Sequence, residues 1–130
     1  MIYLDTSAAA KLVHDEDETP ELSLFLTERA GNPLFSSALL LPELLRAVSR
    51  HDVGLTPRAH TVLQRIMRVP LAHEILSEAA TIGGPSLRTL DAIHLATAAG
   101  FTERLTAFIT YDKRLAAAAA AVGLPVAAPA

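Results

Sequence analysis

The sequence has no cysteine, no tryptophan and only 5% aromatic residues. Without cysteine the chain cannot form a disulfide, a thiolate metal site or a cysteine nucleophile. With so few aromatic rings, an extended platform for stacking nucleic-acid bases is not expected. Any catalytic chemistry must therefore come from carboxylates, histidines or hydroxyls.

Long apolar runs are also missing, although the mean hydropathy is high at +0.33. Prolines and scattered charges interrupt each apolar stretch before it reaches the length that spans a bilayer. The opening residues, Met1 to Asp5, place an acid where a secretory signal needs a cationic segment followed by a long apolar one. We therefore expect a protein with no membrane association and a cytoplasmic location.

Positive charge is in deficit, with 11 Lys and Arg against 14 Asp and Glu, so the net charge is −3. No basic tail is present, which excludes a general attraction to polyanions. Arginines nevertheless outnumber lysines nine to two. Because a guanidinium grips phosphate through two parallel hydrogen bonds, local phosphate contacts remain possible despite the overall charge.

The length of 130 residues with 51% hydrophobic content matches one domain with a real core, residues 1–130. Short apolar runs alternate with segments of helical periodicity, which predicts an α/β domain with a short, mostly parallel sheet covered on both faces. The expected strands are 2–4, 34–36 and 107–110, with weaker ones at 68–71 and 124–126. The expected helices are 8–13, 20–30, 38–52, 59–67, 73–82, 90–99 and 112–122.

Hydroxyl side chains before these helices suggest N-caps. Thr6 or Ser7 is expected to cap the first helix, Thr19 the second and Thr89 the helix at 90–99, with a further cap in the turn 54–57. Pro42 removes a backbone donor, so it should kink the first turns of its helix or move the start.

Four acids occupy positions typical of a site in a parallel sheet, where ligands gather beyond the carboxyl ends of strands. Asp5 follows the first strand, and Asp112 follows the strand at 107–110 and opens a helix, so the two should face one another if their strands are neighbours. Asp91 lies in the first turn of its helix, at the positive end of the helix dipole. Glu43 lies among leucines in an apolar helix, and an acid buried there needs a partner.

Four carboxylates that converge without compensation repel one another, and partial burial raises some of their pKa values. A divalent cation removes that conflict, and an oxygen-only donor set suits Mg²⁺, with Mn²⁺ as a substitute. Such an ion activates water and offsets charge on a phosphodiester, so the pattern favours metal-assisted phosphodiester hydrolysis. For each acid taken singly, a helix cap or a solvated position is an equally good interpretation.

Four segments of the chain, in this order and at these separations, resemble the PIN-domain nucleases, and within them the VapC-type toxins of bacterial toxin–antitoxin pairs. The segments are Ile2-Tyr3-Leu4-Asp5-Thr6-Ser7, Pro42-Glu43-Leu44-Leu45-Arg46, Leu90-Asp91-Ala92-Ile93-His94-Leu95-Ala96-Thr97-Ala98 and Thr110-Tyr111-Asp112-Lys113-Arg114-Leu115. The resemblance implies a three-layer α/β/α fold and a metal-dependent endoribonuclease toxin that hydrolyses RNA. It also implies a homodimer and a small cognate antitoxin of the VapB type as partners.

The resemblance also assigns residues. It places the family's acidic quartet on Asp5, Glu43, Asp91 and Asp112, with Asp5 and Asp91 as the foremost direct metal ligands. Glu43 and Asp112 bind through water, hold a second ion or orient the attacking water.

Hydroxyls and arginines complete the expected site. Thr6 and Thr110 stand beside two of the acids as supporting hydroxyls, although either could simply be a cap. Arg88 and Arg114 are the leading candidates for contact with the RNA backbone, with a merely solubilising role as the alternative.

His94 follows Asp91 by almost one helical turn, so its ring could approach the same site. We interpret it instead as a packing or hydrogen-bonding histidine, because imidazole suits a Mg²⁺ site less well than carboxylate or water does. Apolar residues from Leu22 to Ile66 are numerous enough for a dimer face or an antitoxin groove, with core packing as the equal alternative.

Two other functions are weighed against the nuclease. A non-catalytic RNA- or protein-binding module on the same fold would bind a partner without metal-dependent turnover. A phosphotransfer domain with an aspartyl nucleophile fits poorly, because one such family needs a second Asp where Ser7 stands and another needs an acidic pair where Thr6 follows Asp5.

Overall fold

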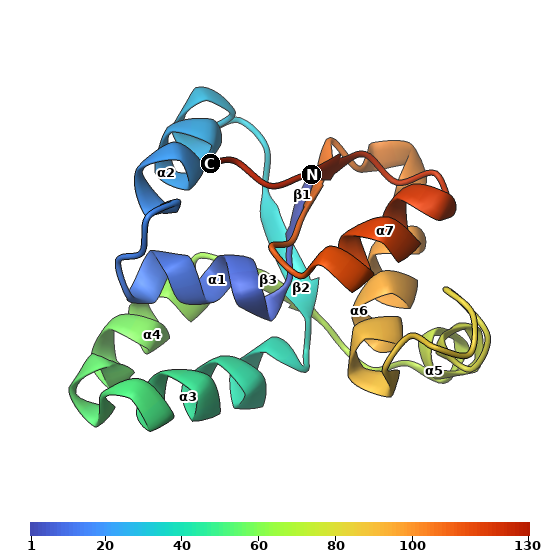
Figure 1. The fold of residues 1–130 in the computed structure, drawn as a ribbon, viewed down its shortest axis with the longest axis horizontal. Coiled ribbons are helices and arrows are strands. Elements are labelled where there is room, and N and C mark those ends of the chain that lie inside the picture. Colours follow the sequence, from blue (N-terminus) through green and yellow to red (C-terminus); the bar gives the residue numbers. More distant parts are fainter.

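The computed structural model describes all 130 residues and places five short strands in one parallel sheet (Figure 1). In order across the sheet, the strands are β3 (Met67–Val69), β2 (Leu34–Ser37), β1 (Ile2–Leu4), β4 (Ala107–Ile109) and β5 (Val126–Ala127). The first strand of the chain is thus the central one. A parallel sheet was expected, and every pairing in it is parallel.

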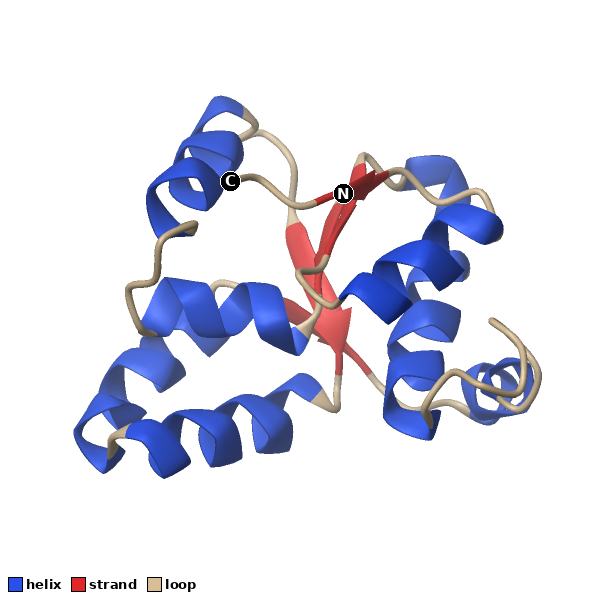
Figure 2. Ribbon diagram, viewed as in Figure 1, coloured by secondary structure: helices blue, strands red, loops and turns tan.

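Helices cover both faces of this sheet, which lies between two groups of helices (Figure 2). One group is α1 (Thr6–Val13), α2 (Thr19–Glu28), α3 (Leu40–His51) and α4 (Thr56–Gln64). The other is α5 (His73–Ala79), α6 (Thr89–Ala99) and α7 (Lys113–Ala121). The three-layer α/β/α fold is confirmed, and none of the helices has the length and apolar character required to cross a membrane.

Side-chain alternation along β1 creates one core on each face of the sheet. Ile2 and Leu4 point into the first core, which α1, α3 and α4 close. Tyr3 points the other way, into a second core with Phe35 and Phe108. All of these strand side chains are fully buried. The central strand therefore fixes both helical layers, and the residue that follows it, Asp5, is held rigidly.

The predicted excess of apolar surface between Leu22 and Ile66 is mostly core. Leu22, Leu40 and Ile66 belong to the first core and are buried. In that part of the chain the large apolar side chains that stay exposed are Leu24, Leu41 and Val53. Core packing, the alternative interpretation of this segment, accounts for most of its hydrophobic residues.

Element boundaries differ from prediction at several ends. Met67 was predicted as the end of a helix, but α4 stops at Gln64 and Met67 opens strand β3 with its side chain 55% exposed. The helix predicted at 73–82 ends at Ala79, and the last strand begins at Val126. Ile66, Ile82 and Leu124 at these ends pack in or against the cores although they lie outside α4, α5 and β5, so their apolar pattern extended the predicted elements too far.

The predicted N-caps are wrong at three helices. Asp5, not Thr6 or Ser7, caps α1, because its Oδ1 accepts from the backbone N–H of Ala8 at 2.9 Å. Thr19 and Thr89 are the first helical residues of α2 and α6, not their caps.

The turn at 54–57 contains the cap position of α4, as predicted, but this residue is Leu55, whose side chain makes no capping hydrogen bond. Leu55 also ends a short 3₁₀ helix, Val53–Leu55. Pro42 falls within the first turn of α3, where its missing N–H has no helical partner to lose.

Candidate active site

The site is built where β1 and β4 end side by side. Leu4 pairs with Ile109 in register, and the backbone N–H of Asp5 donates to the carbonyl of Ile109 at 3.2 Å. The two strands are neighbours, the condition under which Asp5 and Asp112 were expected to face one another, and the residues that directly follow them, Asp5 and Thr110, meet. Thr110 Oγ1 donates to Asp5 Oδ2 at 2.5 Å.

Asp5 is only 4% exposed and is surrounded by hydrogen-bond donors. Its Oδ1 accepts from Ser7 Oγ at 2.7 Å and from the Ala8 N–H, at the N-terminus of α1. Burial raises the pKa of Asp5, and the bonds from Thr110, Ser7 and Ala8 offset that rise only in part. A buried carboxylate that resists ionisation is a group that positive charge would stabilise.

Asp112 lies next to this pair. It is the N-cap of α7, with Oδ1 accepting from the Leu115 N–H at 2.9 Å, and its own N–H donates to Thr110 Oγ1 at 3.1 Å. Thr110 thus links Asp112 to Asp5. The hydroxyl expected beside the last acid contacts the carboxylate of Asp5 and the backbone N–H of Asp112.

Asp91 lies in the first turn of α6, and its pKa is affected by the charges of Asp5 and Asp112. Partial burial raises the pKa of Asp91, the negative charge of Asp112 raises it further, and Asp5 adds to the effect. The positive charge of Arg88 acts in the opposite direction. Because charges interact appreciably only over short distances in salt solution, Asp5, Asp91 and Asp112 form one electrostatic group.

Glu43 lies on α3 and has hydrogen-bond partners different from those of Asp5. Its Oε1 accepts from Thr6 Oγ1 at 2.9 Å and is 2.6 Å from Nε2 of His94. Burial opposes ionisation, but the contacts with His94 and Thr6 outweigh it, so the pKa of Glu43 is lowered overall. The partner that a buried acid at this position requires is therefore His94, with Thr6 as a second donor.

The four acids do not form a ready-made metal cage. No three His, Asp or Glu side chains of the chain are grouped closely enough to hold a metal ion as they stand. Asp5, Glu43 and Asp112 each have a protein hydrogen bond on at least one carboxylate oxygen. Asp91 and Asp112 are only partly buried. The structure thus gathers the acids at one edge of the sheet without closing them around a point.

The two arginines expected to contact substrate lie next to this edge. Arg88 is the residue before α6, and Arg114 lies in the first turn of α7; both are exposed. The charge of Arg88 is close enough to lower the pKa of Asp91 against the larger effect of burial.

The sequence does not reveal two contributors to the site. It predicts Ser7 only as a helix cap, yet the Ser7 hydroxyl donates to Asp5 and accepts from the Tyr111 N–H at 2.9 Å. It predicts Tyr3 only as a strand residue, yet the Tyr3 hydroxyl lies 2.6 Å from Nδ1 of His94. The available signal was a tyrosine in a buried strand, since its hydroxyl requires a partner. His94 is a hydrogen-bonding histidine, as predicted.

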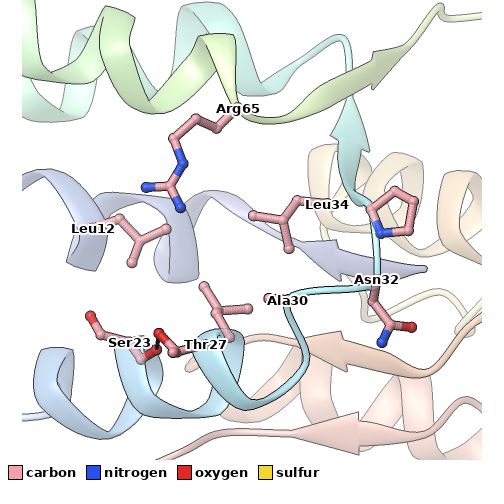
Figure 3. A pocket seen from close by; sticks show the side chains of 9 residues that line it. Leu12, Ser23, Thr27, Ala30, Asn32, Leu34 and Arg65 are labelled. Atoms are coloured by element: carbon pink, nitrogen blue, oxygen red, sulfur yellow. Dashed lines mark hydrogen bonds between the residues drawn. The ribbon is translucent and has the colours of Figure 1, made fainter.

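A well-formed cavity lies elsewhere on the molecule (Figure 3). It is a cavity of about 530 Å³ beside the residues that precede β2, at the amino ends of the strands, so it is at the opposite edge of the sheet from the acids. Leu12, Leu26 and Leu34 line it together with Arg65. It contains none of the four acids, and the candidate chemistry remains at the carboxyl edge.

Comparisons with known proteins agree with this architecture. The model of the PIN domain matches residues 2–121. The chain is 45% identical over 132 residues to a protein named Ribonuclease VapC47 from Mycobacterium tuberculosis (strain CDC 1551 / Oshkosh), which covers 99% of this chain and 97% of that protein. It is 39% identical over 133 residues to Ribonuclease VapC46 of Mycobacterium tuberculosis (strain ATCC 25618 / H37Rv), with 98% and 97% covered.

A solved structure has the same fold. It is Mycobacterium tuberculosis VapC20, described as a toxin that cleaves the sarcin–ricin loop, and it matches with a TM-score of 0.76 over 99% of this chain and 100% of that chain. At 14% sequence identity, this match supports the fold alone.

Proposed function

The chain belongs to the PIN domain family, and from that premise we propose that it is a metal-dependent endoribonuclease, the toxin of a toxin–antitoxin pair. The observation that carries the proposal is the burial of Asp5 at the end of the central strand, where Thr110 connects it to Asp112 and where the charges of Asp5 and Asp112 both raise the pKa of Asp91. Near-full-length relatives named ribonucleases support the same activity.

The donor chemistry fits Mg²⁺ or Mn²⁺. The acids offer oxygen ligands only, and the raised pKa values of Asp5 and Asp91 mark carboxylates that a cation would help to ionise. Asp5 and Asp91 would be direct ligands, and Asp112 and Glu43 would bind the ion or its waters. Asp91 and Asp112, which are partly exposed, would have to turn toward Asp5 to complete the site.

When bound, the ion would lower the pKa of a water molecule and offset negative charge on the phosphodiester. The protein groups then have defined tasks. Thr110 and Ser7 hold Asp5 in one orientation, and Thr6 and His94 hold Glu43. Arg88 and Arg114 would bind backbone phosphates of the RNA on either side of the acids.

The decisive test is cleavage of RNA by the purified protein with Mg²⁺ or Mn²⁺. We expect EDTA to abolish cleavage, and Asp5→Asn or Asp91→Asn to abolish it while circular dichroism shows a folded protein. Asp17→Asn is the matched control, because it removes one exposed carboxylate from the loop before α2. Full activity in either site variant would overturn the proposal.

The alternative is a binding module that keeps the fold without catalysis, and it is favoured by the lack of a preformed metal cage. Calorimetric titration with Mn²⁺ separates the two. A nuclease should show a saturable site that is lost in Asp5→Asn, whereas a module should show none.

We further propose that the chain forms a homodimer and binds a small antitoxin of the VapB type. Exposed leucines on α5 and α6, Leu76 and Leu90, and a hollow between these helices that Leu87 and Ile93 line are suited to an apolar contact. Light scattering of the purified chain tests the dimer, and co-purification with the product of a neighbouring reading frame tests the antitoxin.

A further inference from the structure

A chain of buried hydrogen bonds connects the second core to the acidic edge. Tyr3 is fully buried and His94 is 2% exposed. The Tyr3 hydroxyl lies 2.6 Å from Nδ1 of His94, and Nε2 of His94 lies 2.6 Å from Oε1 of Glu43. The chain therefore runs from strand β1 through helix α6 to helix α3.

The carboxylate of Glu43 faces Nε2 of His94 and can only accept, so the ring proton of a neutral His94 is assigned to Nε2. Nδ1 is then the acceptor for the Tyr3 O–H proton. The backbone N–H of Ser37 donates to the Tyr3 oxygen at 3.2 Å from another side.

This arrangement leaves His94 no free ring nitrogen. Nδ1 accepts from Tyr3 and Nε2 donates to Glu43, so neither nitrogen is available to ligate a metal or to remove a proton from water. His94 can affect the site only through the carboxylate that it holds.

Glu43 is held by one oxygen and leaves the other free. Both His94 and Thr6 donate to Oε1, while Oε2 has no protein hydrogen bond and the side chain remains 25% exposed. A glutamate has several rotatable bonds, and anchoring one oxygen restricts where the second can lie. Oε2 is thus the oxygen that a water, a cation or the substrate can reach.

We propose that Tyr3 and His94 are positioning residues, which fix the rotamer of Glu43 so that Oε2 serves the reaction. This inference rests on the proposed nuclease function. Hydrogen bonds that orient a functional carboxylate typically change metal affinity or activity about 10- to 100-fold when they are removed.

The main variants are His94→Leu and His94→Gln. Leucine fills the volume without donating to Glu43, so kcat for RNA cleavage should fall roughly 10- to 100-fold. KM should change less than kcat, because His94 is buried and both of its ring nitrogens are used within the protein. Gln keeps an N–H donor and should recover part of the loss. Thr97→Val is the matched control, because Thr97 is buried one turn later on α6 and bonds only to the Ile93 carbonyl.

A double-mutant cycle with Glu43→Ala distinguishes positioning from general destabilisation. If His94 acts through Glu43, His94→Leu should lower kcat little further once Glu43 is gone. An equal loss of kcat in both backgrounds, or wild-type kcat in folded His94→Leu, would overturn the inference.

A readout independent of catalysis is the ¹⁵N NMR spectrum of His94. We expect the Nε2–H tautomer in the wild type and its loss as the sole form in Tyr3→Phe. If the wild-type protein does not cleave RNA but shows the Nε2–H tautomer, only the proposed nuclease function is rejected. An Nδ1–H tautomer in the wild type would reject the role of Tyr3 and His94 whatever the activity.

Discussion

Asp5 combines burial with negative charge, so its role in the site is expected to oppose stability. Its pKa in the folded protein is raised above that of the unfolded chain, and the folded state is therefore penalised at pH values above the raised pKa. Asn keeps an oxygen that can cap α1 but carries no charge. We expect Asp5→Asn to raise stability at neutral pH by on the order of 1 kcal/mol while it abolishes cleavage.

The sign of this stability change can be tested by measuring it at different pH values. The gain from Asp5→Asn should shrink as pH falls through the folded pKa, and it should vanish below the unfolded pKa, because Asp5 is then neutral in both states. Urea unfolding of both proteins across this range measures the difference. A variant that is less stable than the wild type at neutral pH would contradict the argument.

The coupling between Asp91 and Asp112 yields a second prediction. Burial is the largest cause of the raised pKa of Asp91, and the Asp112 charge is the next. Asp112→Asn should therefore lower the pKa of Asp91, whereas Arg88→Gln should raise it. NMR titration of the Asp91 carboxyl carbon measures both, with Asp17→Asn as a control that leaves it unchanged. Opposite signs, or no response to either change, would mean that these groups are not close neighbours.

Among the individual residues of the site, the three aspartates could be predicted from the sequence, but the hydrogen bonds that connect Tyr3, His94 and Glu43 could not. Asp5, Asp91 and Asp112 each follow a strand or begin a helix, and local sequence marks such places. The bonds from Tyr3 to His94 and from His94 to Glu43 join residues that are 91 and 51 positions apart. Their formation depends on how α3 and α6 pack against the sheet, which no local pattern specifies.

The connection between α5 and α6 depends on glycine backbone conformations. Gly83 has φ of +77°, and a Cβ built on it would lie 2.5 Å from Leu87 Cδ2. Gly84 has φ of +80° but nothing within 4 Å. The first position is therefore constrained by conformation and space, and the second by conformation alone.

Alanine substitutions separate these two causes. Gly83→Ala should destabilise the protein by about 1–3 kcal/mol, because strain and overpacking add. Gly84→Ala should cost about 1 kcal/mol from the backbone alone. Gly31→Ala, with open space and ordinary φ, should be nearly neutral. Urea midpoints measure all three, and equal values for Gly83→Ala and Gly31→Ala would refute the role of this turn.

Helix starts were the elements least predictable from sequence, and Thr19 shows why. Its hydroxyl donates to the Lys11 carbonyl at 2.8 Å and accepts from the Glu16 N–H at 2.9 Å. It therefore ties the acidic loop to α1 instead of capping α2. A hydroxyl before a helix predicts a cap from local preference, but competing acceptors from a neighbouring element are visible only in the fold.

At the scale of the whole molecule, strand order is what assembles the site. The sequence predicted a parallel sheet and the positions of its strands. It did not predict that β1 lies between β2 and β4, since that order depends on how the connecting helices divide between the two faces. Because β1 is central, residues that follow β1 and β4 meet at the carboxyl edge, and α3 and α6 add Glu43 and Asp91.

The net charge of −3 shapes how such a site would bind RNA. Without a general electrostatic attraction, affinity must come from a few arginines near the acids, and each phosphate contact contributes to the salt dependence of binding. For single-stranded RNA, each contact contributes about 0.7 to the slope of log K against log salt concentration. Two contacts, from Arg88 and Arg114, should therefore account for about 1.4 of that slope.

We expect the double variant Arg88→Ala, Arg114→Ala to weaken RNA binding and to flatten the salt dependence by this amount. Binding should be measured with Asp5→Asn protein, so that the RNA is not cleaved during the titration. Arg104→Ala is the control, because Arg104 is exposed in the 3₁₀ helix Thr102–Arg104, just before β4 and so at the amino edge of the sheet. It removes a positive charge without touching the carboxyl edge. An equal flattening by Arg104→Ala would show that RNA responds to total charge and not to two arginines beside the acids.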